Sequence, residues 1–332
     1  MPHIDKSYQL FPIFAASKKV LADYMINRRN IRVKVMQTLY SLDSMQSQWV
    51  PGQEFRILQK HFDQTKQLFV YSILFITELA RYAETAAMLR ASKHLPSQED
   101  LNVNIKSAGN QIIWQILEDA IFQKAVKEWK ADLLIEKDIV RKIYLQLVET
   151  EEYKAYIAVQ GRERKSEKDF LQYLYTNFLL PNQVFIDHIE EHFTNWDDDG
   201  EMISQLVAAY LAKPSGADID DMISKEKLQY AKSLLETVLT KEEPLMNLIT
   251  PKLTNWDPER IATLDMILMK MGVAEFLYFE TIPPKVTINE YIDLAKDYST
   301  PQSGQFVNGI LDTVHKELVN TQAMNKITYK KS

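Results

Sequence analysis

Apolar residues recur every three or four positions along most of this chain, the spacing that places side chains on one face of a helix. Breaks are expected where Gly, Pro and polar residues gather. The predicted helices cover residues 27–48, 55–91, 108–130, 134–159, 167–192, 200–212, 219–240, 242–250, a segment after Trp256, 286–298 and 303–320. The predicted breaks are Pro51-Gly52, 94–104, 161–166, 197–200 and 213–217.

Composition favours the same all-α fold class. Only 8 of the 332 residues are glycine, which argues against a turn-rich sheet architecture, and 46% are hydrophobic, enough for a sizeable core. The helix after Trp256 has a clear predicted start, because Asp257 can cap it and Pro258 can occupy its first position. Its expected buried stripe is Ile261, Leu264, Leu268 and Met271.

The predicted helix 27–48 combines an apolar stripe with a basic N-terminal end. The stripe consists of Ile31, Val35, Leu39 and Leu42. The basic residues are Arg28, Arg29, Arg32 and Lys34, and no acidic residue precedes Asp43 in this helix. Positive charges at a helix N-terminus oppose the macrodipole. We therefore expect either an anion bound at this end or a frayed first turn.

The chain as a whole is acidic, with a net charge of −6, so any contact with nucleic acid needs a local basic patch. Cysteine is absent, which excludes disulfides and thiol nucleophiles and fits a reducing compartment. No apolar run reaches the roughly 18–20 residues of a membrane span. The N-terminal residues also lack the layout of a secretory signal, and we expect a cytoplasmic protein.

Motifs for catalysis are scarce. Gly304 and Gly309 have the first spacing of a phosphate-binding loop, but Ile310 stands where that loop requires lysine. Residues 188–192, His-Ile-Glu-Glu-His, match the H-x-x-E-H of inverted zincins, with both histidines on one helix face and Glu191 as a general base. The sequence identifies no third ligand, and short matches arise by chance in charged helices. We expect no metal, no cofactor and no enzymatic activity.

Two segments of the chain resemble each other in sequence. Thr194-Asn195-Trp196-Asp197 recurs at 254–257, and residues 170–173 resemble 227–230. Two predicted helices lie between the anchors of each segment, and a third helix follows. This order favours a duplicated helical unit, with chance similarity between amphipathic helices as the alternative.

Several ordered pieces of the chain resemble the NusB family. Residues 27–32 and 37–41 resemble its arginine-rich first helix and Leu-Tyr-Ser end, and Asp265 and Glu275 resemble two acidic positions of a core helix. Residues 285–296 match K-V-x-I-N-E-x-x-x-L-A-K, and 306–312 match F-V-N-G-[IV]-L-D. The resemblance covers about 27–48 and 217–320, whereas compact members have only a short helical connection in place of 49–216.

The resemblance implies a NusB-like helical bundle with a large additional helical insertion. The expected organisation is an N-terminal extension (1–26), the first helix (27–48), the insertion (49–216), the core (217–322) and a tail (323–332). Long family variants resemble a chain beginning Met-Ile-Asn-Arg-Arg, which stands here at 25–29. We therefore expect natural translation to begin at Met25.

The resemblance also implies a non-catalytic role in transcription antitermination. NusB proteins bind the boxA element of ribosomal RNA leaders together with NusE, a small-subunit ribosomal protein, and join the elongating RNA polymerase. The RNA-binding residues expected here are Arg28, Arg29, Arg32, Lys34, Tyr40, Gln305, Phe306 and Asn308. The expected partner-binding residues are Asp265 and Glu275.

Two other functions are open. The chain could be a helical protein–protein scaffold that keeps the fold without reading boxA. NusB-like domains also precede ribosomal-RNA cytosine methyltransferases, but that chemistry uses a cysteine and this chain has none. Packing is the alternative for single residues: Phe306 could lie in the core, and Gly309 could allow a close backbone approach. The aromatic residues expected in the core of the insertion are Trp114, Phe122, Trp129, Tyr144, Tyr153 and Tyr156.

Overall fold

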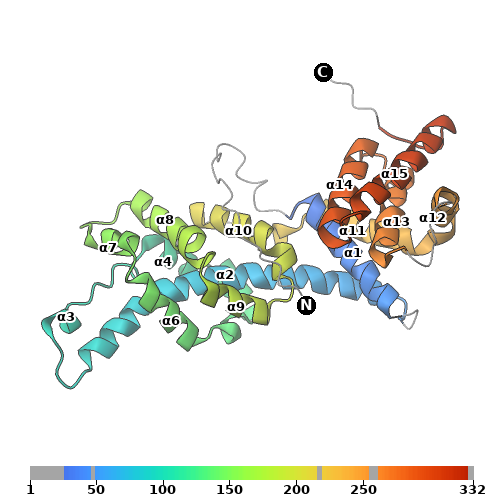
Figure 1. The fold of residues 1–332 in the computed structure, drawn as a ribbon. Helices are drawn as coiled ribbons and strands as arrows, with labels where there is room; N and C mark the ends of the chain where they lie inside the picture. The colour runs from blue at the N-terminus through green and yellow to red at the C-terminus, as the bar shows by residue number, and fades with distance from the viewer. Residues whose placement is uncertain (1–25, 46–48, 215–218, 254–260, 328–332) are drawn as a thin grey trace.

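The computed structural model describes residues 26–45, 49–214, 219–253 and 261–327, and every regular element in these ranges is a helix. The molecule is elongated, with two helical lobes that meet at α1 (Arg28–Ser44) (Figure 1). The expected start at Met25, the start of a helix at Asp257-Pro258 and the second copy of the Thr-Asn-Trp-Asp anchor lie outside the described residues. Among the helices described, none combines the length and the apolar character that a membrane span requires.

The larger lobe is built along α2 (Gln53–Ala91), the longest helix in the described part of the chain. Gly52, with φ +88°, makes the turn that precedes it, as the Pro51-Gly52 break predicts. Shorter helices pack along its length, and α10 returns beside it (Figure 1). The helices of this lobe besides α2 are α3 (Gln98–Leu101), α4 (Gln111–Glu118), α5 (Ala120–Glu128), η1 (Ala131–Leu134), α6 (Lys137–Leu147), α7 (Glu151–Ala158), α8 (Arg164–Tyr173), η2 (Leu174–Leu179), α9 (Gln183–His192) and α10 (Trp196–Ala212).

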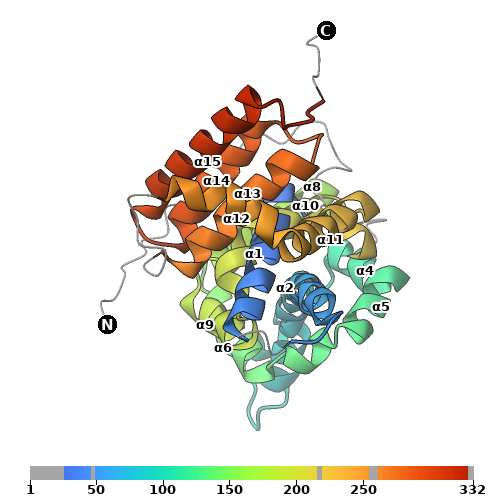
Figure 2. The ribbon, with the colours of Figure 1, turned by 90° about the vertical axis from the view of Figure 1, so that its right-hand side faces the viewer.

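The smaller, C-terminal lobe is arranged around α13 (Thr263–Tyr278), which packs against the other helices of the lobe and against α1 (Figure 2). Leu268 and Met271 of its predicted stripe are buried, and Ile261 and Leu264 are partly buried. The remaining helices are η3 (Ile219–Met222), α11 (Lys225–Thr240), α12 (Glu242–Ile249), η4 (Thr250–Lys252), α14 (Pro284–Tyr298) and α15 (Ser303–Asn320).

Three long predicted helices are each split in the structure, because a capping side chain lies inside the periodic stretch. Asp119, Thr150 and Asn182 take extended backbone conformations and accept hydrogen bonds from the amides of the helices that follow them. The predicted break at 197–200 is wrong. Helix α10 runs through it, with three aspartates in its first turn, where negative charge is favourable.

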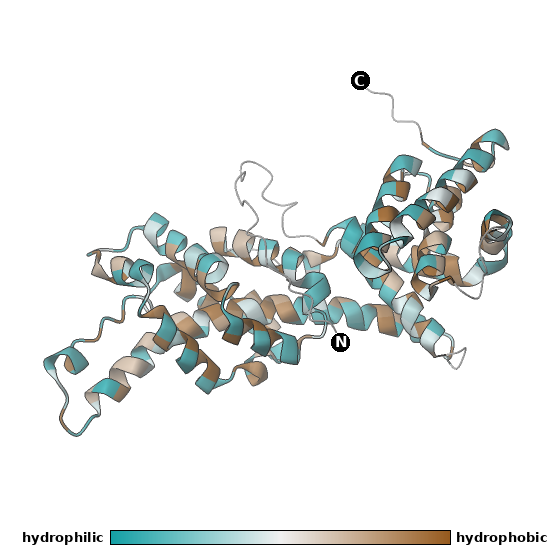
Figure 3. Ribbon diagram, in the orientation of Figure 1, coloured by the Kyte–Doolittle hydropathy of each residue, from teal (hydrophilic) through white to brown (hydrophobic). Residues whose placement is uncertain are grey.

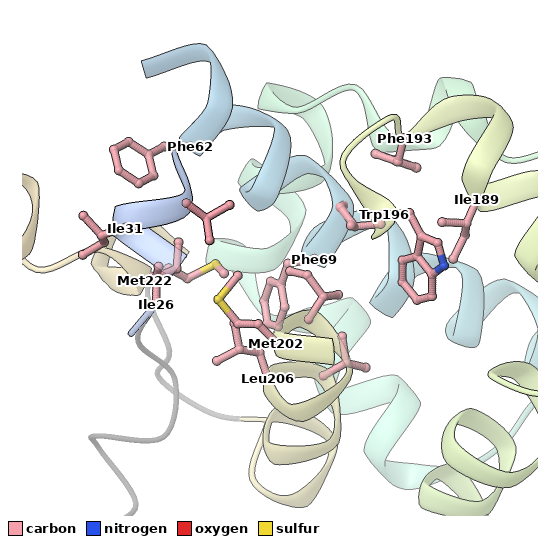
Figure 4. Close-up of a cluster of buried hydrophobic side chains, with 14 of the residues drawn as sticks. Ile26, Ile31, Phe62, Phe69, Ile189, Phe193, Trp196, Met202, Leu206 and Met222 are labelled. Carbon is pink, nitrogen blue, oxygen red and sulfur yellow. The ribbon is translucent and has the colours of Figure 1, made fainter. Parts of the chain in front are cut away.

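Apolar side chains join the two lobes. The predicted stripe of α1 is buried along its whole length, and brown and teal positions alternate on most helices (Figure 3). Ile26 and Ile31 lie near Phe62 of α2 and Met222 of η3, and the same cluster continues into α10 (Figure 4). The Ile26 amide also donates to the Met222 carbonyl at 2.8 Å. Because this apolar core is continuous, α1 belongs to both lobes.

The helix order is compatible with the proposed duplication. In the insertion, α8 with η2, then α9, then α10 follow one another, and α11, α12 and α13 repeat that order with similar lengths. Duplication stays a prediction, because the second anchor is outside the described residues. Of the insertion aromatics expected in the core, Trp114 is exposed and Trp129 is partly buried, while the other four are buried.

Candidate nucleic-acid interface

The N-terminal end of α1 carries its basic residues without fraying. Asn27 caps the helix by accepting a hydrogen bond from the Asn30 amide at 2.9 Å. Arg28 and Arg29 are partly exposed and pair with Glu226 of α11 at 3.0 Å and Asp297 of α14 at 2.6 Å. These carboxylates offset the unfavourable charges of the first turn, so the described conformation needs neither a bound anion nor a frayed end.

Arg32, expected to contact RNA, is buried instead, with 2% of its side chain exposed. Its Nε donates to Glu275 Oε1 at 2.8 Å, its Nη2 donates to Glu275 Oε2 at 3.2 Å, and its Nη1 donates to Glu290 at 3.1 Å. A forked guanidinium on a carboxylate is the geometry that best stabilises a buried charge. As placed, Arg32 offers a phosphate no surface and holds α1 to the C-terminal lobe.

Glu275, expected to bind a protein partner, is the buried acceptor of this cluster. Besides Arg32, it accepts hydrogen bonds from Tyr230 at 2.5 Å, Thr287 at 2.8 Å and Tyr291 at 2.8 Å. Burial alone raises the pKa of Glu275. The charge of Arg32 and the hydrogen bonds lower the pKa by more than burial raises it, so the pKa lies below the ordinary value. The carboxylate is ionised and enclosed, and it presents nothing to a partner.

Lys34, which was also expected to contact RNA, is buried like Arg32. Its Nζ donates to Asp199 of α10 at 2.8 Å, and the same carboxylate oxygen accepts from Thr65 at 2.7 Å and Asn195 at 2.7 Å. Lys34 therefore connects α1 to the insertion lobe. Its ammonium is out of reach of a phosphate in this conformation.

One face of the first turns of α15 carries the residues expected to contact bases. Gln305 and Asn308 are exposed, and Phe306 is half-buried. A Cβ added to Gly309 would meet nothing within 4 Å, so packing inside this chain does not account for the glycine. Asp265, the other expected partner contact, is buried and accepts a hydrogen bond from Ser303 at 2.7 Å. It fixes the start of α15 on α13.

Tertiary contacts bring the N-terminal end of α1 to the end of α14, the helix that precedes α15. Asp297, the partner of Arg29, lies at the end of α14, one short connection before α15 begins at Ser303. Lys227 of α11 lies close to Arg28 at the N-terminal end of α1. Burial, followed by the positive charge of Arg28, lowers the pKa of Lys227. Lys227 could not be identified from the sequence, because only the fold brings α11 to the first helix.

Tyr40 is exposed but lies elsewhere. It is twelve residues beyond Arg28, which is about 18 Å along a helix. It lines a polar groove of about 220 Å³ between α1, α2 and the start of α10, together with Gln37, Ser41, His61, Gln64, Thr194, Asn195 and Asp198. Burial, followed by the charge of Lys34, lowers the pKa of His61 to about 4, so His61 is neutral near pH 7.

Known proteins resemble the C-terminal part of the chain. The NusB family model matches residues 198–316, a range that begins inside α10, ahead of the expected core boundary at 217. "Transcription antitermination protein NusB" of Salinibacter ruber is 40% identical over 97 residues, which are 29% of this chain and 61% of that protein. The protein of the same name from Chloroherpeton thalassium is 32% identical over 134 residues, 38% of this chain and 64% of that protein.

The chain matches a larger share of a third relative. The "Transcription antitermination protein NusB" of Oleidesulfovibrio alaskensis is 37% identical over 117 residues, 35% of this chain and 74% of that protein. No solved structure matches the chain. The matched segment contains α11, α13, α14 and most of α15, the helices that enclose Glu275 and carry the exposed start of α15. On this similarity and its all-helical structure, the chain belongs to the NusB family.

Proposed function

We propose that this chain is a transcription antitermination factor that binds single-stranded boxA-type RNA together with NusE in the RNA polymerase elongation complex. The similar proteins are named transcription antitermination proteins, and these names support a role in that process. RNA binding rests on the surface around the first turn of α1.

One observation carries the RNA proposal: the two exposed arginines of α1 are held by carboxylates that are themselves exposed. The Glu226 side chain is 80% exposed and that of Asp297 is 56% exposed. Exposed ion pairs contribute little to stability, so a phosphate can displace these carboxylates at small cost. A guanidinium also matches phosphate geometry in a two-pronged contact.

The proposed path of the strand runs from α1 to α15. Arg28, Arg29 and Lys227 contact phosphates, Gln305 and Asn308 read base edges, and the half-buried Phe306 offers its ring for stacking. Tyr40 offers a separate stacking surface beside its polar groove. Arg32 and Lys34 act indirectly, by fixing the orientation of α1. Neither Asp265 nor Glu275 exposes a carboxylate, so we place no NusE contact on them.

The test is fluorescence anisotropy of a labelled boxA-like RNA and a scrambled RNA, with and without NusE, across a salt series. Each lost phosphate contact lowers the salt slope by about 0.7 for a single strand, so Arg28→Ala/Arg29→Ala should lower it by about 1.4. Arg141→Ala/Lys142→Ala is the matched control, because it removes the same charge from an exposed pair on α6.

Equal weakening in both double variants would mean that overall charge governs binding, and the α1 site would be wrong. If the folded protein binds both RNAs equally or binds neither, with or without NusE, the scaffold function replaces the antitermination proposal.

A further inference from the structure

Three side chains with metal-ligand chemistry meet in the insertion lobe, away from α1. His188 and His192 lie one turn apart on α9, and Glu136 immediately precedes α6. One ligand atom from each lies within 4.8 Å of the other two. Glu136 Oε1 is 3.7 Å from His188 Nδ1 and 3.7 Å from His192 Nε2. The fold thus supplies the third ligand that the H-x-x-E-H pattern lacks.

Hydrogen bonding leaves a lone pair on Nε2 of both histidines. His192 Nδ1 lies 3.0 Å from the His188 carbonyl oxygen, which can only accept, so Nδ1 carries the proton of the neutral ring. His188 hydrogen-bonds the backbone of Leu134, while its own Nε2 is buried with no partner among the described residues. Histidines that bind metals usually donate their other N–H to a carbonyl in this way.

Glu136 is free of a local role. It occupies the N-cap of α6 but makes no capping hydrogen bond, and its carboxylate faces the two histidines of α9. The Tyr71 hydroxyl nearby is also buried without a partner in the described part of the chain, and burial and the charge of Glu136 raise its pKa. Two unpartnered buried polar atoms at one place call for an explanation, and a bound ion with its water supplies one.

We propose that Glu136, His188 and His192 bind a divalent transition-metal ion, for which zinc is the best match. Imidazole nitrogen and carboxylate oxygen are common zinc ligands, and donors around a tetrahedral zinc are about 3.4 Å apart, so the 3.7 Å between His192 Nε2 and Glu136 Oε1 needs only a small contraction. The His188 atom at 3.7 Å from Glu136 Oε1 is Nδ1, so binding through its unpartnered Nε2 requires that ring to turn. Glu136 is about half exposed, which leaves an entry path and a position for water. The ion fastens α9 to the start of α6; no hydrolytic step is part of the proposal.

The test is calorimetric titration of the full chain with zinc chloride after dialysis against a chelator. Wild type should bind one equivalent, and so should His94→Ala, a control that removes an exposed histidine. His192→Ala should weaken binding by more than about 100-fold, beyond the 10–100-fold typical of an outer partner, and Glu136→Gln should weaken it less. Zinc should raise the Tm of wild type but not of His192→Ala.

Cobalt gives an independent readout, since a tetrahedral site should show intense visible absorption in wild type that is missing in His192→Ala. The proposal is overturned if folded wild type binds no zinc, or if His192→Ala binds it as wild type does. RNA binding is measured in a separate anisotropy experiment, so each proposal can be contradicted without affecting the other.

Discussion

Helix α1 carries two buried ion pairs that face opposite lobes and differ in how completely they are satisfied. Arg32 meets Glu275 in the C-terminal lobe through a two-pronged contact, and three hydroxyls complete the carboxylate. Lys34 meets Asp199 in the insertion lobe through a single ammonium. Around the second pair, Gln37 Oε1 and Asn195 Oδ1 are buried without partners among the described residues.

The difference follows from side-chain chemistry. A guanidinium fixes its acceptor in a plane, whereas an ammonium is a point charge that leaves more freedom to its surroundings. The acidic partners Glu275 and Asp199 both lie within the matched family segment 198–316, and Arg32 and Lys34 both precede it. We infer that the first pair attaches α1 to the C-terminal lobe and that the second attaches α1 to the insertion lobe.

The largest expected effect is that of Glu275→Gln. It leaves Arg32 as a buried charge with only the partly exposed Glu290 for compensation, and should lower the free energy of unfolding by about 3–5 kcal/mol. Urea denaturation followed by circular dichroism measures it. Glu290→Gln is the control and should cost much less. Equal losses in the two variants would show that the buried contact is not special.

The Glu275 carboxylate should also make the stability of the fold sensitive to acid. Its pKa is lowered in the folded state, so its contribution to stability is complete above the ordinary value of 4.5 and is lost as the pH falls below it. As the pH falls below 4.5, the Tm of the wild-type protein should therefore decrease more steeply than the Tm of Glu275→Gln. Parallel curves would contradict this assignment.

A smaller effect is expected at the insertion. Lys34→Met leaves Asp199 buried without its cation, but Thr65 and Asn195 still donate to it, so the loss should fall near the lower end of about 3–5 kcal/mol. Lys34→Met/Asp199→Asn removes both charges and should be more stable than the single variant. A double variant less stable than Lys34→Met would show that the hydrogen bonds from Thr65 and Asn195 offset the cost of burying the Asp199 carboxylate without its cation.

The smallest effect contrasts one glycine from each lobe. Gly309→Ala meets open space and should raise the free energy of unfolding by about 1 kcal/mol. Gly200→Ala should gain less, because its Cβ would lie 3.2 Å from the Trp196 ring. Thermal denaturation compares the two. If Gly309→Ala gains stability but loses RNA affinity, the open space at Gly309 is a ligand contact; unchanged affinity would exclude that role.

The sequence alone determined the local features of the protein. Helical spacing placed α2, α14 and α15 within a few residues, and all four residues of the stripe predicted for α1 are buried. The ordered motifs from 265 to 312 identified the family. Where the periodic signal continued through a cap such as Asp119 or Thr150, the sequence merged two helices, because an apolar stripe is unaffected by a change of axis at a polar residue.

Only the tertiary structure decided which charges are exposed. Four basic residues near the start of α1 look alike in the sequence, yet Arg28 and Arg29 face solvent while Arg32 and Lys34 are buried. Their acidic partners come from α10, α11, α13 and α14, far away in the chain. A charged side chain is buried only where the fold places a residue of opposite charge beside it. The local spacing of residues cannot predict that partner, because it lies far away in the sequence.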